Sequence, residues 1–413
     1  MRVLFTTSNW GGHYFCMIPL GWALQAAGHE VRVACPPEQV AAISQAGLIP
    51  VPVLHGPDMT YWARLNAYQE ALKAPSGVLP PHPVTGRRVR RLDEFDVEAE
   101  SARFWQQLPG LLERSYDNAV AFGQAWRPDL VLYDLMAPEG ALVARLAGVP
   151  AVYHSLGLFG AMETEPGMEM GLEDPTGSFA RHGAQPWDRS QITHVIDPSP
   201  DGAVPPHGTT TRIPVRYLPY NGPGELPDWL RTPPSRPRVC VMWGYSASAM
   251  LGLEVPALRH AINAAVDTGA EVVLTASEEQ VEALGDLPPQ VRVMRDFPLH
   301  LVLATSDAVV HHGGASALMT AAAAGVPQLA LSPSDVYQRY GKRFAQTGAV
   351  CCLPGLQTSE QEVTEATHAV LHGVEYRQAA RRVMAEQQAR PTPADLVGTL
   401  VELASTTPER MVA

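Results

Sequence analysis

Short runs of β-branched residues alternate along the chain with longer stretches of small and apolar residues. The N-terminal segment reads RVLFTT at 2–7, then a glycine pair, an apolar stretch from residue 18, Gly28, and EVRVAC at 30–35. This order predicts a buried strand, a helix that ends at a glycine, and a second buried strand. A strand–helix–strand unit predicts a parallel sheet covered by helices.

A second series of strand-like runs follows a proline-rich segment. Residues 219–237 contain six prolines and two glycines, which exclude a long helix or a central strand and predict an interdomain linker. Runs at 238–244, 270–276, 291–297 and 307–312 then continue the strand pattern. We therefore expect an α/β protein with two doubly wound Rossmann-like domains facing each other across a cleft.

The expected boundaries follow from this pattern. Residues 1–218 form the N-terminal domain, 219–237 the linker and 238–392 the C-terminal domain, and 393–413 form a helix that returns to the N-terminal domain. Residues 55–105 and 155–212 do not fit the pattern, because they are rich in Pro, Gly, Met, aromatic and charged residues. We interpret them as irregular insertions that serve as lids or binding loops.

Two segments of the chain resemble each other. DLVLYDLMAPEGALVARLAGVPAVY at 129–153 and DAVVHHGGASALMTAAAAGVPQLAL at 307–331 both run from an Asp through a strand, a turn and a small-residue helix to AGVP and another strand. One interpretation is a single architectural unit used once in each half. The other is that such units resemble each other through fold physics alone.

Charge and cysteine content narrow the classes of function. The 413 residues are 46% hydrophobic and 17% charged, with a net charge of −12. Without a long basic run, DNA or RNA is disfavoured as a partner, although a local pocket can still bind a small anion. Five cysteines without metal-ligand spacing favour a reducing, cytoplasmic setting. No apolar stretch is long enough for a membrane span or a signal peptide.

The turn at 311–316 has the composition of an anion site. Gly313 and Gly314 permit backbone angles that other residues avoid and let a ligand approach closely. A helix N-terminus carries about half a positive charge and free amides, and a neighbouring imidazole adds a donor. Ser316 could cap the helix or face the ligand. A tight turn with two packed histidines is the competing interpretation.

Common nucleotide fingerprints are missing from the chain. No G-x-G-x-x-G follows a strand, which disfavours a nicotinamide dehydrogenase. No G-x-x-x-x-G-K-[ST] is present, which disfavours a P-loop NTPase.

Several segments together resemble GT-B glycosyltransferases, specifically the bacterial TDP-sugar enzymes that decorate polyketides and other natural products. The matching stretches are GGHYFCMIPLGWALQAAGHEVRVA, YLPYNGPGELPDWL, RVCVMWGYSAS, DFPLHLVLATSDAVVHHGG, HHGGASALMTAAAAGVPQLAL and RPTPADLVGTLVELA. They cover nearly the full length apart from the two insertions.

The resemblance implies an inverting transfer of a deoxysugar from a TDP-sugar to a hydrophobic acceptor, with an aromatic polyketide as our preferred acceptor and a macrolide as its rival. Such enzymes serve antibiotic biosynthesis. No Asp-x-Asp pair is present, so we expect no metal and no cofactor besides the donor. Nucleic acid and membrane partners are not expected, and a homodimer stays open.

The resemblance also assigns donor-side residues. His311 contacts the diphosphate, and His312 points to the other face if the strand continues. Ser316 and Ala317 stand where the family usually has Gly and Thr. The diphosphate group comprises His311, His312, Gly313, Gly314, Ala315, Ser316, Gly244 and Ser246. The nucleobase side of the cleft comprises Trp243, Phe297, Pro298 and Leu299. The sugar pair is Asp335 and Gln338.

On the acceptor side, the resemblance makes His13 the general base for the acceptor hydroxyl, a role that suits a near-neutral pKa. Asp134 matches an acidic position that supports catalysis, and a carboxylate often orients a base histidine. The alternatives are a capping or cleft-lining His13 and an Asp134 that caps the following helix.

Two other functions stay open at this point. A nucleotide-sugar epimerase or hydrolase of the same fold would lack an acceptor pocket, which the apolar insertions count against. A non-catalytic relative that activates a partner would have lost His13 or the histidine pair, and both are present.

Overall fold

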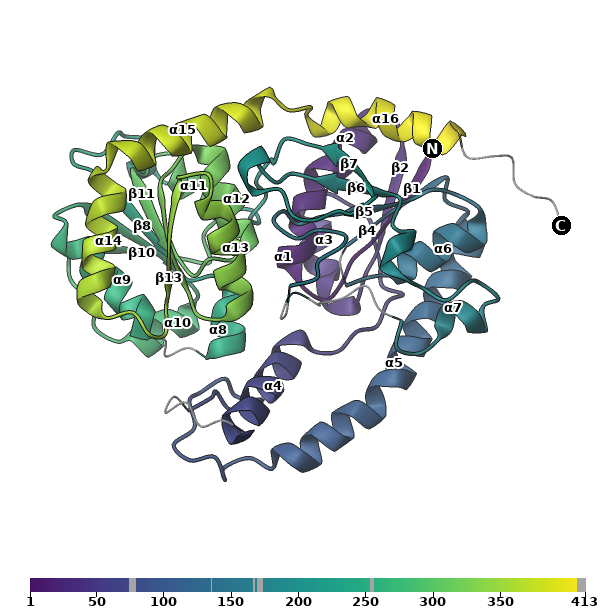
Figure 1. The fold of residues 1–413 in the computed structure, drawn as a ribbon, viewed down its shortest axis with the longest axis horizontal. Helices are drawn as coiled ribbons and strands as arrows, with labels where there is room; N and C mark the ends of the chain where they lie inside the picture. Colours follow the sequence, from purple (N-terminus) through teal and green to yellow (C-terminus); the bar gives the residue numbers. More distant parts are fainter. Residues whose placement is uncertain (74–78, 135, 166–167, 169–173, 253–255, 407–413) are drawn as a thin grey trace.

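The computed structural model describes residues 1–413 except 74–78, 135, 166–167, 169–173, 253–255 and 407–413. The described chain forms two parallel sheets that lie side by side with helices around each (Figure 1). This arrangement is the GT-B architecture of two Rossmann-like domains. No helix within the described residues has both the length and the apolar character needed to cross a membrane.

The N-terminal sheet has seven strands in the order β3-β2-β1-β4-β5-β6-β7. Its strands are β1 (Arg2–Thr6), β2 (Glu30–Ala34), β3 (Pro50–Val51), β4 (Leu130–Tyr133), β5 (Ala151–His154), β6 (His194–Asp197) and β7 (Thr211–Pro214). Its helices are α1 (Gly11–Tyr14), α2 (Ile18–Ala26), α3 (Val40–Gln45), α4 (Met59–Lys73), α5 (Val97–Trp126), α6 (Glu139–Ala147) and α7 (Ser178–Arg181).

The C-terminal sheet has six strands in the order β10-β9-β8-β11-β12-β13. Its strands are β8 (Arg238–Met242), β9 (Glu271–Ala276), β10 (Val291–Arg295), β11 (Ala308–His311), β12 (Gln328–Ser332) and β13 (Val350–Pro354). The helices that follow are α8 (Tyr245–Leu251), α9 (Pro256–Asp267), α10 (Glu278–Leu284), α11 (Leu299–Leu303), α12 (Ala315–Ala324), α13 (Asp335–Ala345), α14 (Glu360–His372), α15 (Val374–Ala389) and α16 (Pro393–Thr406).

The two sheets share a topological plan that explains the repeated sequence. β4 lies beside β1, and β11 lies beside β8, so each sheet reverses its strand order at the same place. The helices α6 and α12 both end at a glycine with positive φ, 65° at Gly148 and 68° at Gly325. Ligands of doubly wound sheets bind beyond the carboxyl ends of the strands at such a reversal. The loops after β1, β4, β8 and β11 are therefore the place to look for a site.

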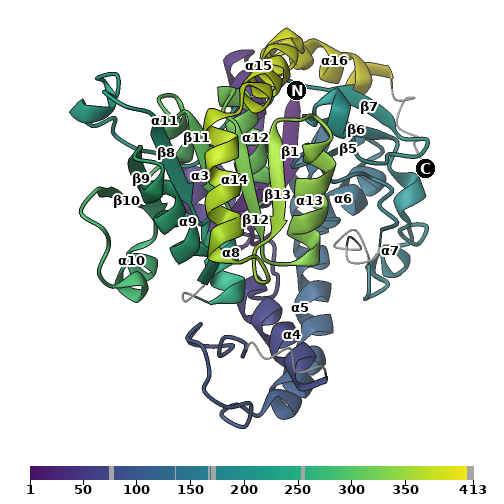
Figure 2. The ribbon, with the colours of Figure 1, turned by 60° about the vertical axis from the view of Figure 1, so that its left-hand side comes forward.

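The two insertions are more regular than the sequence suggested. Residues 55–105 contain α4 and the first turns of α5, and Figure 2 shows these helices extending from one end of the molecule. Residues 155–212 contain β6 and the first two residues of β7, the last two strands of the N-terminal sheet. The irregular interpretation was therefore wrong for α4, for the start of α5 and for β6, whereas the described residues between β5 and β6 are mostly loop.

Helices of the C-terminal half join the two domains. α16 packs on α2, and its Leu396, Val397 and Leu400 belong to the N-terminal core, so the chain crosses over the top of both domains (Figure 1). In α13, Arg343 forms an ion pair with the buried Glu163, with Nη1 2.6 Å from Oε1 and Nη2 3.2 Å from Oε2. These contacts fix how the strand ends of one sheet face those of the other.

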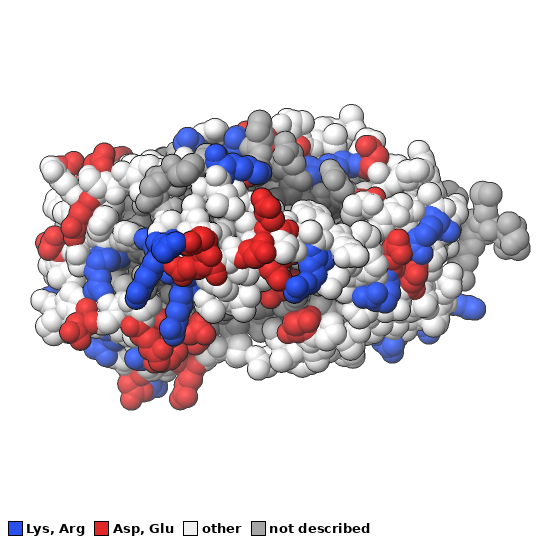
Figure 3. Space-filling model, turned by 90° about the horizontal axis from the view of Figure 1, so that it is seen from below, with Lys and Arg blue, Asp and Glu red and all other residues white. Residues whose placement is uncertain are grey.

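Charged side chains of both signs are mixed over the end of the molecule that carries α4 and α5 (Figure 3). Many of them pair locally, as Arg103 does with Glu100 on α5 at 3.0 Å. Exposed pairs of this kind contribute little to stability and do not make a polyanion-binding surface.

Candidate functional site

A cavity of about 570 Å³ lies between the two domains at the strand ends. The N-terminal domain contributes Trp10, Gly12, His13, Phe15, Met59, Trp62, Ala63, Met136 and Leu156. The linker and C-terminal domain contribute Asn221, Met242, Trp243, Gly244, Ser246, Met250, Thr275, Ala276, Ser277, Gln280, Asp296, Phe297, Leu299, His312, Gly314, Ala315, Ser316, Ala317, Ser334, Val336, Tyr337 and Tyr340. The cavity is mostly apolar, with a few convergent polar groups, as ligand sites usually are.

His13 is the histidine that the N-terminal domain brings to this cavity. It lies in α1, which begins at Gly11 just beyond the loop after β1, so the glycine pair starts a helix rather than a turn. Its Nδ1 is buried and has no hydrogen-bond partner within the described residues. Burial lowers the pKa of His13 from 6.5 to about 4, because the imidazolium form would lose its hydration. His13 is therefore neutral and able to accept a proton at physiological pH.

Asp134 does not orient His13 in this structure. Its Oδ2 accepts hydrogen bonds from Ser8 N–H at 2.6 Å and Ser8 Oγ at 2.9 Å, and its Oδ1 accepts from Met136 N–H at 2.6 Å. The capping alternative is also wrong, because the N-cap of α6 is Pro138. Burial raises the pKa of Asp134 to about 6, and these hydrogen bonds oppose the increase. Asp134 instead ties together the loops after β1 and β4.

The two histidines of the turn point in different directions from those predicted. His311, which is fully buried, donates from Nε2 to Gln328 Oε1 at 3.0 Å and accepts from Gly313 N–H at Nδ1, 3.0 Å away. Both ring nitrogens are used inside the domain, and His311 does not line the cavity. The expectation that His311 rather than His312 faces the donor is wrong. Gln328 of β12 binds the His311 ring inside the domain, so only His312 of the two reaches the cavity.

His312 is the cavity-facing member of the pair. Its Nδ1 accepts from Gly244 N–H at 3.2 Å, which leaves Nε2 as the protonated nitrogen. Burial, with His311 as the second cause, lowers the pKa of His312 to about 3, so the ring is a neutral donor. A Cβ on Gly244 would lie 2.7 Å from His312 Cε1, and a Cβ on Gly314 would meet Nε2. Glycine is needed at both positions to make room for this ring.

The turn after His312 opens a helix N-terminus toward the cavity. Gly313 has φ 84°, a conformation that favours glycine, and Gly314 is the N-cap of α12. The first helical hydrogen bond runs from Leu318 N–H to Gly314 C=O at 3.0 Å, so the amides of residues 315–317 precede it. Ser316 lies inside the first turn rather than at the cap. This geometry suits an anion between α12 and His312.

The loop after β8 and the start of α11 form another wall of the cavity. Trp243 is 1% exposed, and its carbonyl accepts from Gln280 Nε2 at 3.1 Å, while Gly244 and Ser246 also line the space. Phe297 and Leu299 line it as well. Pro298 does not, because it packs against Gly224 of the linker and serves as the N-cap of α11.

The residues of α13 that line the cavity differ from those predicted from the sequence. Asp335 is exposed, and neither it nor Gln338 lines the cavity. Val336, Tyr337 and Tyr340 do so instead. The spacing of Tyr337, Tyr340, Gly341 and Phe344 is the signal that could have identified this face, since residues three and four apart share one side of a helix.

Met59 and Trp62 also line the cavity, and they lie in α4, within the insertion 55–105 for which the sequence predicted binding residues. Arg64 Nε of the same helix donates to Ala249 O of α8 in the other domain. Asn221 of the linker is a lining residue that the sequence did not predict. It accepts from His300 N–H at 3.1 Å. No metal site can be placed within the described residues, since no three His, Cys, Asp or Glu side chains gather there.

Comparison with known proteins places this architecture in one family. Models of the erythromycin biosynthesis protein CIII-like N-terminal and C-terminal domains match residues 22–244 and 259–403. The L-demethylnoviosyl transferase of Streptomyces niveus is 35% identical over 410 residues, covering 99% of this chain and 100% of that protein.

Two solved structures are similar to this chain over nearly its full length. Spinosyn forosaminyltransferase SpnP matches with a TM-score of 0.76 and 30% identity, covering 98% of this chain and 99% of the other. The glycosyltransferase VinC in complex with dTDP matches with a TM-score of 0.75 and 30% identity, covering 98% and 100%. The chain therefore belongs to the erythromycin biosynthesis protein CIII-like family and is a glycosyltransferase of the GT-B fold.

Proposed function

We propose that this enzyme transfers a deoxysugar from a TDP-sugar to a hydroxyl of a hydrophobic aglycone, with inversion at the sugar carbon and without a metal ion. The observation that carries the proposal is that one cavity brings His13 of the N-terminal domain together with His312 and the α12 N-terminus. A relative bound to dTDP supports the choice of nucleotide.

In the proposed reaction, His13 removes the proton of the acceptor hydroxyl while that oxygen forms a bond to the anomeric carbon. The bond from this carbon to the diphosphate oxygen breaks, and its electron pair leaves with TDP. Negative charge grows on the diphosphate, where His312 Nε2–H and the amides of residues 315–317 would stabilise it. Attack from the side opposite the leaving group inverts the configuration.

The acceptor side favours a flat, apolar molecule. Trp10, Phe15, Met59 and Trp62 line the cavity together with His13, all from the N-terminal domain. Aromatic rings stack on planar partners, and methionine adapts to irregular apolar shapes. We propose an aromatic polyketide as the acceptor class.

The test has a binding arm and a reaction arm. Saturating TDP should raise the melting temperature, since a ligand that binds only the native state stabilises it. A panel of aromatic and macrolide aglycones with TDP-deoxysugars should then give a glycoside by mass spectrometry, in the inverted anomeric form by NMR. Absence of any shift with TDP contradicts the donor assignment. Donor cleavage without glycoside would indicate a hydrolase instead.

A further inference from the structure

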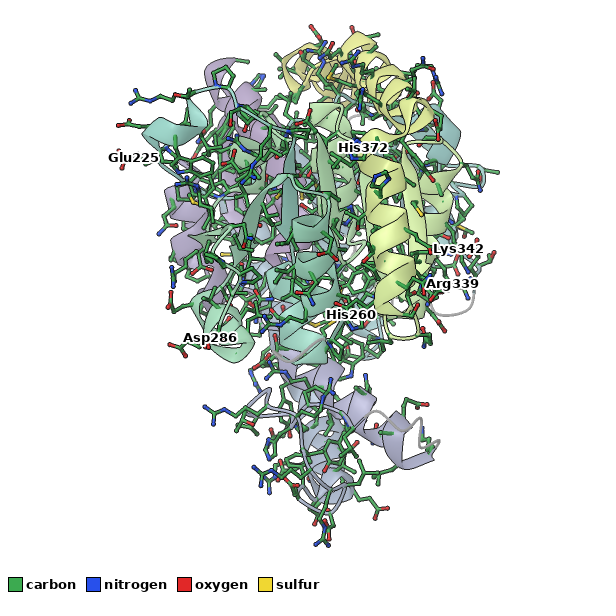
Figure 4. The ribbon with its side chains drawn as sticks, turned by 90° about the vertical axis from the view of Figure 1, so that its left-hand side faces the viewer. Glu225, His260, Asp286, Arg339, Lys342 and His372 are labelled. Atoms are coloured by element: carbon green, nitrogen blue, oxygen red, sulfur yellow. The ribbon has the colours of Figure 1, made fainter. Side chains whose placement is uncertain are left out.

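A helical arm of the N-terminal domain reaches the C-terminal domain beside the cavity. We use this name for α4 together with residues 79–108, which include the first half of α5. Leu65, Tyr68, Val89 and Val97 form a buried cluster within the arm itself. Figure 4, in which the C-terminal domain faces the viewer, shows the arm directly beneath that domain. The arm is therefore a unit with its own small core that lies next to both halves of the molecule.

The arm supplies part of the cavity wall. Met59, Trp62 and Ala63 of α4 all line the cavity, and their spacing places them on one side of the helix. Ser246 and Met250 of α8 line the cavity from the C-terminal domain. Helices from both domains therefore bound the cavity at this end, and its shape depends on how the arm lies against α8.

Arg64 joins the arm to the end of α8. Its Nε donates to Ala249 O in the last turn of α8, and its Nη1 donates to Pro83 O of the arm at 3.4 Å. The carbonyls of a last helical turn have no partner within the helix, and a cation suits that end of the helix dipole. One guanidinium thus binds the end of α8 and the backbone of the arm at the same time.

Two glycines let the backbones of the two domains touch at this contact. A Cβ on Gly252, the residue after α8, would lie 2.9 Å from the carbonyl oxygen of Gly86 in the arm. A Cβ on Gly86 would lie 2.5 Å from Arg64 Nη2. A side chain at position 252 would therefore push the arm away from α8, and one at position 86 would displace the guanidinium.

The helix that connects the arm to its own domain is interrupted. α5 runs from the arm into the body of the N-terminal domain, and Pro109 lies within it, followed by Gly110. Proline has no N–H to donate to the preceding turn and bends a helix. The contact with α8 therefore gives the arm a second point of attachment, beyond the bend in α5.

We propose that Arg64 is a positioning residue, which holds the arm against α8 so that the wall formed by Met59 and Trp62 keeps water from the anomeric carbon of the donor. Arg64 does not itself line the cavity, so it acts through these two side chains.

Loosening the arm would let water take the place of the acceptor. The water oxygen would form a bond to the anomeric carbon, and its proton would pass to His13. The bond from this carbon to the diphosphate oxygen would break, and its electron pair would leave with TDP. This inference rests on the proposed function and adds a residue that decides between transfer and hydrolysis.

The experiment measures free sugar and glycoside by mass spectrometry, with the TDP-deoxysugar and the aglycone that give product in the panel above. Arg64→Met should raise both the ratio of free sugar to glycoside and the KM for the aglycone roughly three- to tenfold, with the dissociation constant for TDP within about twofold of wild type. A smaller folded fraction would lower both products together and leave their ratio unchanged.

Three other variants complete the set. Arg64→Lys keeps the cation but has one nitrogen in place of the forked group, so its ratio should lie between those of wild type and Arg64→Met. Gly252→Ala should raise the ratio from the other side of the contact. Arg103→Met removes an exposed cation of the same arm, which pairs with Glu100 at 3.0 Å, and is the matched control.

Hydrogen exchange of the α4 amides tests the contact independently of activity. Exchange should be faster in Arg64→Met than in Arg103→Met, because only the first variant releases the arm from α8. Equal exchange in the two variants would overturn the inference. So would an unchanged ratio of free sugar to glycoside in Arg64→Met or Gly252→Ala, or the same change of ratio in Arg103→Met. Wild-type protein that forms neither free sugar nor glycoside would remove the proposed function, and the exchange comparison would still decide whether Arg64 holds the arm.

Discussion

Replacing His13 tests whether the N-terminal half of the cavity supplies the base. His13 is the histidine from that domain in the cavity lining, and its Nδ1 has no partner within the described residues. His13→Ala should lower kcat by roughly 10²–10⁴-fold, the usual contribution of a positioned general base. The dissociation constant for TDP should stay near the wild-type value, because the diphosphate groups come from the other domain.

The pKa of His13 also predicts how the activity changes with pH. Burial lowers the pKa of His13 from 6.5 to about 4. At pH 5.5 a histidine with a pKa of 4 is about 97% neutral, whereas one with a pKa of 6.5 is about 9% neutral. The buried base therefore predicts about tenfold more activity at pH 5.5 than an exposed histidine would allow.

The assay is kcat/KM for the acceptor from pH 4.5 to 8.0 at saturating donor, because this ratio reports the pKa values of the form that the acceptor meets. Asp134, with a pKa of about 6, is a second group that titrates in this range, so the profile is repeated in Asp134→Asn. A decline near pH 6 that disappears in this variant belongs to Asp134. Burial raises the pKa of Glu139 to about 7, so the profile is also measured in Glu139→Gln. A decline near pH 6.5 that persists in both variants would refute the buried-base reasoning, as would near-normal turnover in His13→Ala.

Three further predictions concern the donor side and the domain contact. His312→Phe should weaken TDP binding roughly 10- to 100-fold, because it removes a hydrogen-bond donor to the diphosphate. His311→Asn should lower the melting temperature and change the TDP affinity less. A larger loss of TDP affinity in His311→Asn than in His312→Phe, measured by calorimetry, would contradict the assignment. Treatment with EDTA should leave turnover unchanged, because His312 Nε2–H and the amides at the start of α12 are positioned to stabilise the diphosphate charge, and a loss restored by Mg²⁺ would argue against metal-free transfer. Arg343→Met should lower the free energy of unfolding by about 3–5 kcal/mol, because it leaves the buried Glu163 carboxylate without its cation. Glu163→Gln should cost less, because Arg343 keeps Glu165 at 3.6 Å, and the two changes together should cost less than the sum; additive losses in urea unfolding would show that the pair is uncoupled.

The sequence by itself determined the architecture and the location of the site. Strand and helix periodicity, the proline-rich linker and the repeated AGVP units predicted two doubly wound sheets, and the polarity of parallel strands placed the loops of His13 and the histidine pair at facing edges. Local composition carries this information, because the apolar pattern of a buried parallel strand and the glycine at a helix end are properties of short segments.

Only the tertiary structure decided which side chains meet in the cavity. The histidine pair looked symmetrical in sequence, and the partners Gln328 and Gly244, 17 and 68 residues away, assigned one ring to the core and the other to the site. Asp134 turned to Ser8 rather than His13 for the same reason. On α13, packing against the other domain turned Tyr337 and Tyr340 inward and left Asp335 exposed. The orientation of each side chain depends on neighbours distant in sequence, whereas the elements themselves depend on neighbours close along the chain.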